Sequence, residues 1–364
     1  MAHYDAFVLV SFGGPEAPAD VMPFLENVTR GRGVPRERLA EVAHHYDRFG
    51  GVSPINQQCR DLVAAIEKNF AGSGLDLPVY WGNRNWRPYL AETVGTMAAN
   101  GVRRAIAFVT SAYGSYSSCR QYLDDIETAR RRVGPGAPRI DKIRHFFNHP
   151  GFIGPFAEST LAAIQSLPAG ARPGAPLVFT AHSVPESMAA ASGPAGDLYP
   201  AQLAEAARLV AAGVAAADGR ERPWRLVYQS RSGPPSVPWL GPDVSDHLAD
   251  LASNGAPGAV LVPVGFVSDH MEVRYDLDVE AAQAGRRLGL PLARAATPGT
   301  HPSFVSMITE LVRERADAPR LARGGRPARR ARGVMGPGPD VCADTCCRPQ
   351  QSSHPAARPG TADD

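Results

Sequence analysis

Four carboxylates follow one another at helical spacing in the segment FVSDHMEVRYDLDVE, which comes directly after an apolar run. They are separated by 3, 4 and 4 positions and are Asp269, Glu272, Asp276 and Glu280. An α-helix places residues three and four apart on one face, so the four would form an acidic row beside His270. Such a row is either a solvated helix surface or a path for cations or protons. Because ligands bind where parallel strands end, and the row begins at such a point, we favour the path.

A single histidine, His182, ends another apolar run in the sequence FTAHSVPES. An imidazole at that place can ligate a metal or act as a base near neutral pH, and it can equally be a structural side chain. What His182 faces would decide between these roles. The elements that position His182 are predicted from the apolar pattern of the chain.

Short apolar runs alternate with amphipathic segments along most of the chain. The runs expected to be strands are 5–12, 77–83, 104–111, 140–147, 175–183, 224–230 and 258–266. This alternation predicts an α/β fold with parallel sheets flanked by helices. The pattern restarts near residue 150, so we expect two tandem Rossmann-like halves with a cleft between them. The loop SFGGPE after the first run lacks the GxGxxG sequence of dinucleotide sites.

Composition limits the classes of protein that this chain can be. It has 364 residues, of which 44% are hydrophobic, and a formal net charge of +2. A large core is therefore expected, and nothing indicates a nucleic-acid partner. No run reaches the roughly 20 apolar residues of a membrane span. The start MAHYDAFVLVSF has neither a basic region nor a cleavage site, so we expect a cytoplasmic protein without an integral membrane segment.

The expected organisation has two halves and a C-terminal extension. The predicted units are an N-terminal half at 1–149, a C-terminal half at 150–300, a terminal helix at 301–318, a flexible linker at 319–341, a cysteine cluster at 342–347 and a disordered tail at 348–364. The linker prediction rests on its density of arginine, glycine and proline.

Several motifs together resemble the ferrochelatase family, whose members insert ferrous iron into a porphyrin. The motifs are TAHSVPE at 180–186, PVGFVSDHME at 263–272, SFGGPE at 11–16, NVTRGRGVP at 27–35, FGGVSPIN at 49–56 and YQSRSGPPSVPWLGPDV at 228–244. The resemblance runs in the family's order from about residue 4 to 318, and it is closest to the actinobacterial coproporphyrin III branch. It implies a class II chelatase fold and a lyase of heme biosynthesis.

The resemblance also implies roles for individual residues. His182 on one wall and Glu272 on the other would form the catalytic, metal-binding pair, and imidazole and carboxylate suit ferrous iron. The acidic path for iron or protons would consist of Asp269, His270, Asp276 and Glu280. The sequence offers Ser53, Tyr122, Arg30, His45 and Tyr46 as candidate porphyrin contacts. Ser53 and Tyr122 match the family's substrate contacts best, whereas Arg30 could equally be a surface charge. Several bacterial relatives carry an axial tyrosine where this chain has Phe12, which cannot ligate iron.

Three cysteines crowd into the sequence CADTCC near the C-terminus. These cysteines are Cys342, Cys346 and Cys347, and three thiolates leave a 2Fe-2S cluster one ligand short. The resemblance to actinobacterial ferrochelatases implies such a cluster with one internal cysteine. We favour Cys119 over Cys59, because Cys59 lies at helical spacing among apolar residues and is expected to be buried. From spacing alone, four thiolates could equally form a structural zinc site.

The segment 27–48 bears on the choice of porphyrin. It reads NVTRGRGVPRERLAEVAHHYDR, which is basic and polar rather than an apolar membrane-docking lip. We therefore expect ferrous iron and coproporphyrin III as substrates and Fe-coproporphyrin III as product. The alternatives are a protoporphyrin IX ferrochelatase, a cobaltochelatase of the same class, and a non-catalytic tetrapyrrole-binding or iron-sulfur sensor protein. We also expect a monomer, with enzymes of the heme pathway as protein partners.

Overall fold

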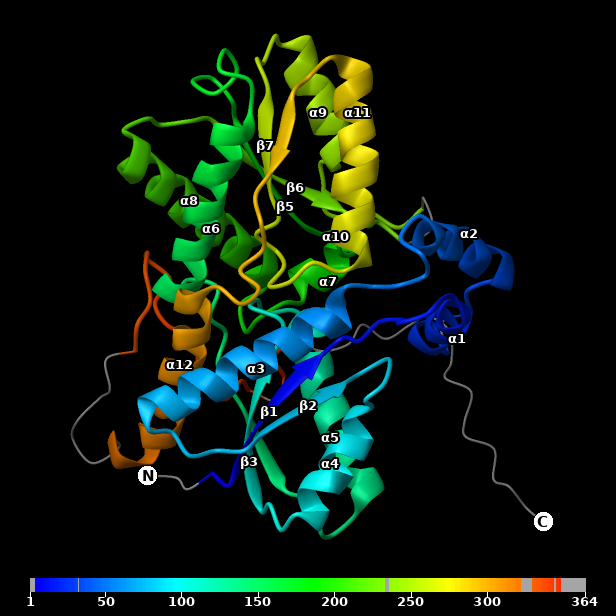
Figure 1. The fold of residues 1–364 in the computed structure, drawn as a ribbon, viewed down its shortest axis with the longest axis vertical. Coiled ribbons are helices and arrows are strands. Elements are labelled where there is room, and N and C mark those ends of the chain that lie inside the picture. Colours follow the sequence, from blue (N-terminus) through cyan, green and yellow to red (C-terminus); the bar gives the residue numbers. More distant parts are fainter. Residues whose placement is uncertain (1–3, 32, 233–235, 322–328, 344, 348–364) are drawn as a thin grey trace.

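Two four-stranded parallel sheets form the centre of the computed structural model, which describes residues 4–31, 33–232, 236–321, 329–343 and 345–347 (Figure 1). The strand orders are β2-β1-β3-β4 and β6-β5-β7-β8, so one topology occurs twice. The strands are β1 (Ala6–Ser11), β2 (Val79–Asn83), β3 (Arg104–Val109), β4 (Arg139–Lys142), β5 (Leu177–His182), β6 (Trp224–Gln229), β7 (Ala259–Val262) and β8 (Leu292–Arg294). The predicted α/β fold of two similar parallel-sheet halves is confirmed.

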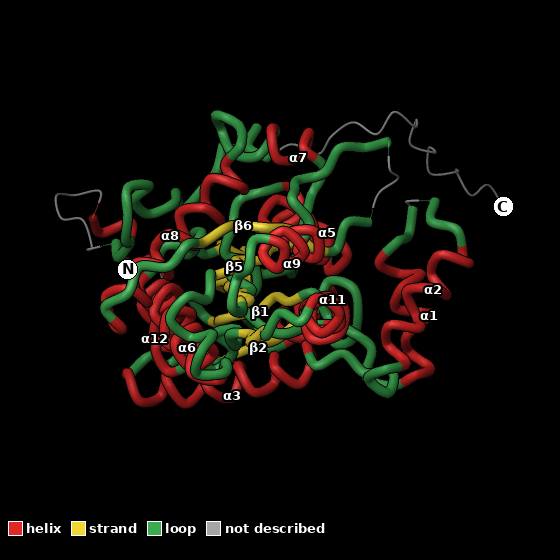
Figure 2. Tube along the Cα trace, turned by 90° about the horizontal axis from the view of Figure 1, so that it is seen from above, coloured by secondary structure: helices red, strands yellow, loops and turns green. Residues whose placement is uncertain are grey.

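Helices connect the strands and lie on both sides of the sheets (Figure 2). Those of the first half are α1 (Pro18–Val28), α2 (Arg36–Asp47), α3 (Ile55–Ser73), α4 (Leu90–Ala99) and α5 (Gln121–Val133). Those that follow are α6 (Pro150–Ser166), α7 (Glu186–Ala190), α8 (Leu198–Asp218), α9 (Val244–Ser253), α10 (Met271–Tyr275), α11 (Ala282–Leu288) and α12 (Pro302–Leu321). Two segments are π-helical, η1 (Tyr116–Arg120) and η2 (Asp276–Ala281). No helix among the described residues has the length and apolar character that a membrane span needs.

The central strands are apolar because helices cover both of their faces. Every residue of β1 is buried, and its Phe7 is in register with Val79 of β2 and Ile106 of β3. Strand β5 has the same place in the second sheet, between β6 and β7. Because the strands of each sheet are parallel, their carboxyl ends meet at one edge, where β5 presents His182.

Helix α12 ties the two halves together. Its apolar residues recur at i, i+3, i+4, i+7 and i+8, and all are buried. They are Phe304, Met307, Ile308, Leu311 and Val312. This face packs against α3 of the first half and α6 of the second. Burial of each side chain contributes about 1.5–3 kcal/mol, so the helix is a strong connection between the halves. The terminal helix predicted at 301–318 is therefore present, at 302–321.

The segment 329–341 is held to the folded body, so the prediction of a flexible linker is wrong for these residues. The Arg329 Nε donates to Glu314 of α12 at 2.8 Å. The Val334 N–H donates to Glu205 of α8 at 2.9 Å. Composition indicated a mobile connector because arginine and glycine favour exposed, extended chain. In the folded protein these arginines find carboxylates on the body, which composition cannot show.

The structure describes only some of the other ranges predicted for the C-terminal region. Residues 319–321 belong to α12, whereas 322–328 and the predicted tail at 348–364 lie outside the described residues. All three cysteines of the predicted cluster are described.

Helices α1 and α2 form an arm that stands to one side of the sheets (Figure 2). Phe24 of α1 and Tyr46 of α2 are buried in one apolar cluster with Met271 of α10. The arm therefore connects the N-terminal half to the segment that carries Glu272. This places two predicted porphyrin contacts, His45 and Tyr46, next to the predicted metal-facing region.

Candidate active site

The second sheet brings His182 and Glu272 together. His182 is the last residue of β5, and Glu272 lies in α10, which follows the carboxyl end of β7. The His182 Nε2 and Glu272 Oε1 atoms are 3.5 Å apart, and the side chains are 34% and 46% exposed. The His182 Nδ1–H donates to the Ser183 carbonyl, so the other ring nitrogen, Nε2, faces Glu272. A base and a carboxylate thus share one accessible surface.

The two residues lie on the same wall, whereas the sequence analysis expected them on facing walls. Both belong to the C-terminal half. A flat aromatic ring between them would need a gap of roughly 7 Å, about twice the van der Waals contact distance. The observed 3.5 Å leaves no such gap. A macrocycle could only lie across the pair, with its other face toward the N-terminal half.

Each member of the pair stabilises the charged form of the other. Burial opposes protonation of His182, but the charge of Glu272 and a hydrogen bond to it raise the imidazole pKa above its ordinary value. Burial likewise opposes ionisation of Glu272, and the charge of His182 and the same hydrogen bond lower its pKa. The pair is therefore an imidazolium and a carboxylate near neutral pH.

Asp276 is a buried carboxyl group held by the last residue of β6 and by the residue after it. The Ser230 hydroxyl donates to Asp276, and the Gln229 Nε2 lies 3.3 Å from the same oxygen. Burial, together with the charges of Glu272 and Glu280, raises the pKa of Asp276 to about 7, although the Ser230 hydrogen bond and the charge of His182 oppose this rise. Asp276 can therefore gain or lose a proton near neutral pH.

The acidic row is not one continuous α-helical face. It begins in α10, continues through the π-helical η2 and returns to an α-helix in α11. A π-helix has a wider turn than an α-helix, which changes how Asp276 and Glu280 follow Glu272. Glu280 is partly buried, and burial raises its pKa. Such π segments are frequent at functional sites.

Two predicted members of the acidic path have other partners. Asp269 pairs with Arg294 at 2.9 Å and accepts from Thr297 at 3.0 Å, so its charge is already balanced. His270 caps α10 by accepting the Glu272 N–H at 3.2 Å. Burial lowers the pKa of His270, which keeps the ring neutral and able to act as this acceptor.

Two predicted porphyrin contacts of the N-terminal half lie near the carboxyl edge of the first sheet. Ser53 is buried so close to Gly14 that a Cβ on this glycine would come within 2.7 Å of the Ser53 Cβ. Tyr122 is buried in α5, and its hydroxyl lies 3.4 Å from the Thr110 hydroxyl. Arg84, which follows β2 and was not predicted as a site residue, has its guanidinium 4.6 Å from the Tyr122 ring centroid. A lone arginine after a strand gave no signal.

The arm places its predicted contacts over α10. The His45 ring stacks on Tyr275, with centroids 3.7 Å apart and planes 5° apart. Tyr46 is buried, and burial together with the charge of Glu272 raises the pKa of its phenol. His45 and Tyr46 thus lie beside the helix that carries Glu272.

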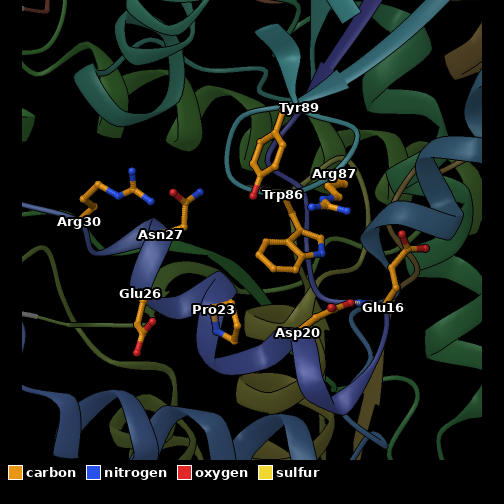
Figure 3. Close-up of a pocket in the computed structure, with 9 residues that line it drawn as sticks. All are labelled: Glu16, Asp20, Pro23, Glu26, Asn27, Arg30, Trp86, Arg87 and Tyr89. Atoms are coloured by element: carbon orange, nitrogen blue, oxygen red, sulfur yellow. Dashed lines mark hydrogen bonds between the residues drawn. The ribbon is translucent and has the colours of Figure 1, made fainter. Parts of the chain in front are cut away.

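Arg30 lies in a different place. It lines a cavity of about 700 Å³ between α1 and the loop after β2 (Figure 3). The other lining residues are Glu16, Asp20, Pro23, Glu26, Asn27, Trp86, Arg87 and Tyr89. Trp86 occupies the middle of this view, and Arg30 lies at one side. Neither His182 nor Glu272 lines this cavity, so Arg30 is not gathered with the metal-facing pair.

Comparison with known proteins supplies the family. A model of the ferrochelatase family matches residues 4–316, which include every element from β1 to β8. The chain belongs to the ferrochelatase family. The matched range includes both His182 and Glu272.

Curated relatives match nearly the whole chain. The coproporphyrin III ferrochelatase of Streptomyces griseus is 52% identical and the alignment covers 98% of this chain and 96% of the relative. The protein of the same name from Frankia alni is 55% identical, with 97% and 89% covered. The ferrochelatase of Rhodopirellula baltica is 53% identical, with 94% and 93% covered.

A solved structure supports the fold of this ferrochelatase independently of its sequence. SirB from Bacillus subtilis with Fe³⁺ superposes with a TM-score of 0.53 at 10% identity. The match covers 87% of this chain and 98% of SirB. The two-sheet architecture is therefore that of the class II chelatases.

Four cysteines of this ferrochelatase come together through successive contacts. Cys119 in η1 and Cys342 share a hydrogen bond, which raises the pKa of Cys119 and lowers that of Cys342. Cys342 also neighbours Cys346, and the Cys346 and Cys347 sulfurs are 3.6 Å apart. Cys59 lies elsewhere, on the buried face of α3 in the core, where burial raises its pKa to about 11. The favoured fourth cysteine, Cys119, is thus the one placed with the C-terminal cysteines.

The described thiols do not surround one point as the ligands of a single metal ion would. Among the described residues, no three His, Cys, Asp or Glu side chains are grouped so as to hold one metal ion. A tetrahedral zinc site needs four ligands around one ion. The four ligands of a 2Fe-2S cluster are instead divided between two irons.

Proposed function

We propose that this ferrochelatase inserts ferrous iron into coproporphyrin III and releases Fe-coproporphyrin III and two protons. The observation that carries the proposal is the 3.5 Å approach of His182 and Glu272 on one accessible wall. The names of the relatives from Streptomyces griseus and Frankia alni support the choice of porphyrin.

The pair suits the two tasks of metallation. The porphyrin must lose two pyrrole protons, and the iron must exchange water ligands for pyrrole nitrogens. His182 accepts a pyrrole proton through Nε2 only in its neutral form, which is the minor form near neutral pH because Glu272 raises its pKa. Glu272 stabilises the imidazolium that results. Imidazole and carboxylate are also ligands that ferrous iron accepts, so the same two groups can hold the incoming metal.

Asp276 and Glu280 extend this site along η2. Burial raises the pKa of both carboxyl groups, so either can take up a proton that leaves His182. His270 is neutral and stands next to Glu272, within 4.0 Å of its carboxylate. The charge of Asp269 is already balanced by Arg294, so Asp269 contributes to the site by fixing the start of α10.

The porphyrin would lie between this wall and the carboxyl edge of the first sheet. Ser53 and Tyr122 contribute hydroxyl groups there, and Arg84 lies beside Tyr122 with its buried guanidinium paired to Asp125. Arginine and hydroxyl groups suit propionates. Coproporphyrin III has four propionates, and the polar arm with His45 and Tyr46 favours it over the less polar protoporphyrin IX. Arg30 serves as a more distant propionate contact.

We further propose that Cys119, Cys342, Cys346 and Cys347 hold a 2Fe-2S cluster. The gathered thiols and the lowered pKa of Cys342, which favours its thiolate, support this assignment. A bound cluster would add an electron-accepting group, which metallation does not require. We propose that these cysteines serve to fasten the C-terminal segment. We also propose a cytoplasmic monomer.

An anaerobic assay tests the function. Purified protein is mixed with ferrous iron and either coproporphyrin III or protoporphyrin IX, and the porphyrin absorption is followed. Faster metallation of coproporphyrin III is expected, and a preference for protoporphyrin IX would refute the substrate assignment. His182→Ala should bind porphyrin but not metallate it. Unchanged metallation by this variant would refute the proposed role of His182.

A further inference from the structure

The carbonyl of His182 lies just beyond the point where the second sheet stops pairing on one side. β5 pairs with β6 as far as His182 and Gln229, but with β7 only as far as Phe179. Gly265 then donates its N–H to the Thr180 carbonyl at 3.0 Å. Since the peptide groups of a strand alternate between its two neighbours, the His182 carbonyl is the next acceptor on that side. Within the described strands it has no partner.

A phenol binds the His182 carbonyl, which β7 does not reach. The Tyr199 hydroxyl donates to the His182 carbonyl at 2.9 Å. Tyr199 lies in the first turn of α8 and is buried. Its own N–H donates to the Ser192 hydroxyl at 2.9 Å, and its ring meets the Tyr113 ring edge-on at 6.3 Å. The phenol is therefore held in position by both its backbone and its ring.

The peptide group between His182 and Ser183 is consequently fixed on both sides. Tyr199 binds its carbonyl, and the Ser183 N–H donates to the Gln229 carbonyl at 2.8 Å. The Ser183 carbonyl in turn accepts from the His182 Nδ1–H. A rotation of this peptide would therefore turn the imidazole and move Nε2 away from Glu272.

We propose that Tyr199 is a positioning residue for His182, holding the imidazole toward Glu272 by pinning the backbone where strand pairing has ended. The inference rests on the proposed role of His182 in metallation. Tyr199 is buried and acts through the backbone carbonyl of His182, so its loss should slow the chemical step without weakening porphyrin binding. Misplacement of a reacting group by about 1 Å can lower a rate by up to about a hundredfold.

Tyr113 provides a matched control. It is also buried, its hydroxyl donates to a backbone carbonyl, that of Val264, at 2.7 Å, and its ring packs against Tyr199. Tyr113→Phe and Tyr199→Phe each remove one buried hydroxyl and leave one carbonyl unpaired. A general loss of packing or stability would affect both variants equally. Of the two tyrosines, Tyr199 is the one whose hydroxyl donates to His182.

The experiment compares kcat and the KM for coproporphyrin III in the full-length protein and both variants, with thermal midpoints measured in parallel. We expect Tyr199→Phe to lower kcat about tenfold or more with KM little changed, and Tyr113→Phe to lower kcat less than about twofold at a similar midpoint. Equal effects on kcat in the two variants, or a rise in KM that accounts for the loss, would overturn the proposal.

Two further variants keep the outcome decisive. If Tyr199→Phe does not fold, Ser192→Ala replaces it, because it releases the Tyr199 backbone and leaves the phenol; an unchanged kcat in this variant would then reject the proposal. His182→Ala separates the two hypotheses. If this variant metallates normally, the role of His182 fails. If it is inactive while Tyr199→Phe matches the unmodified protein, only the positioning role fails.

Discussion

The imidazole of His45 stacks face to face on the ring of Tyr275, with centroids 3.7 Å apart and planes inclined by 5°. His45 belongs to α2 of the arm, and Tyr275 ends α10, the helix that carries Glu272. The contact therefore connects the arm to the helix that carries Glu272. It holds the arm against the metal-facing wall.

Replacing His45 by Ala should weaken porphyrin binding. Stacked aromatic pairs contribute about 0.5–1.5 kcal/mol beyond their buried area, so the affinity should fall about two- to tenfold. His44→Ala is the matched control, because His44 lies on the same helix but is exposed and pairs only with Asp47. Fluorescence titration with coproporphyrin III measures both. Equal affinities of the two variants would contradict the role of the stack.

The His182 and Glu272 pair predicts a pH dependence with a definite sign. Glu272 raises the pKa of His182 above 6.5, and metallation needs the neutral imidazole. The acid limb of kcat/KM should therefore lie above pH 6.5 in the unmodified protein. In Glu272→Gln the limb should move to lower pH, although the maximal rate falls. A limb that stays in place or moves to higher pH would show that Glu272 does not set the protonation of His182.

The same pair predicts how stability changes with pH. The raised pKa of His182 stabilises the fold fully below pH 6.5, and this contribution is lost as the pH rises through the raised value. The lowered pKa of Glu272 stabilises the fold above pH 4.5, and this contribution is lost as the pH falls through the lowered value. The difference in thermal midpoint between the unmodified protein and Glu272→Gln should be largest between these two pH values. A constant difference at all pH values would argue against the ion pair.

The fold could be predicted from sequence wherever apolar runs were long. Parallel strands covered on both faces are continuous apolar segments, so β1, β3 and β5 were visible. The strand β8 was missed because it has three residues, all half-buried, and no apolar run. The strand expected at 140–147 ends at Lys142. Beyond it Arg144 leaves the sheet and is buried against Glu314, a partner 170 residues away.

The site could be predicted only where a motif marked it. His182 and Glu272 lay in recognisable segments, and their approach is a consequence of neighbouring strands β5 and β7. The roles of Arg84 and Ser230 were not visible, because their partners Tyr122 and Asp276 are 38 and 46 residues away in sequence and meet them only in the folded chain. Asp269 had the spacing of a path residue, but its partner Arg294 lies on another strand.

Ser230 should control the access of iron through Asp276. Its φ of 61° is a left-handed conformation that costs a residue other than glycine about 1–2 kcal/mol, and its hydroxyl holds Asp276. Ser230→Ala keeps the backbone strain and loses the hydrogen bond, whereas Ser230→Gly loses both. Both variants should raise the KM for ferrous iron several-fold with little change in the KM for porphyrin. In denaturant unfolding, the free energy of unfolding of Ser230→Gly should exceed that of Ser230→Ala by about 1 kcal/mol. An unchanged KM for iron in both variants would remove Ser230 from the iron path.

The cysteine assignment predicts that two buried cysteines behave differently. Cys119 is buried next to Cys342, whereas Cys59 is buried among apolar side chains of the core. In anaerobically purified protein we expect visible absorption and about two irons per chain. Cys119→Ala should lose both, because it removes a ligand. Cys59→Ala should keep both and only lower the thermal midpoint, because it leaves a small cavity. Colourless protein containing zinc would reject the cluster, and loss of colour in Cys59→Ala alone would assign the fourth ligand to Cys59.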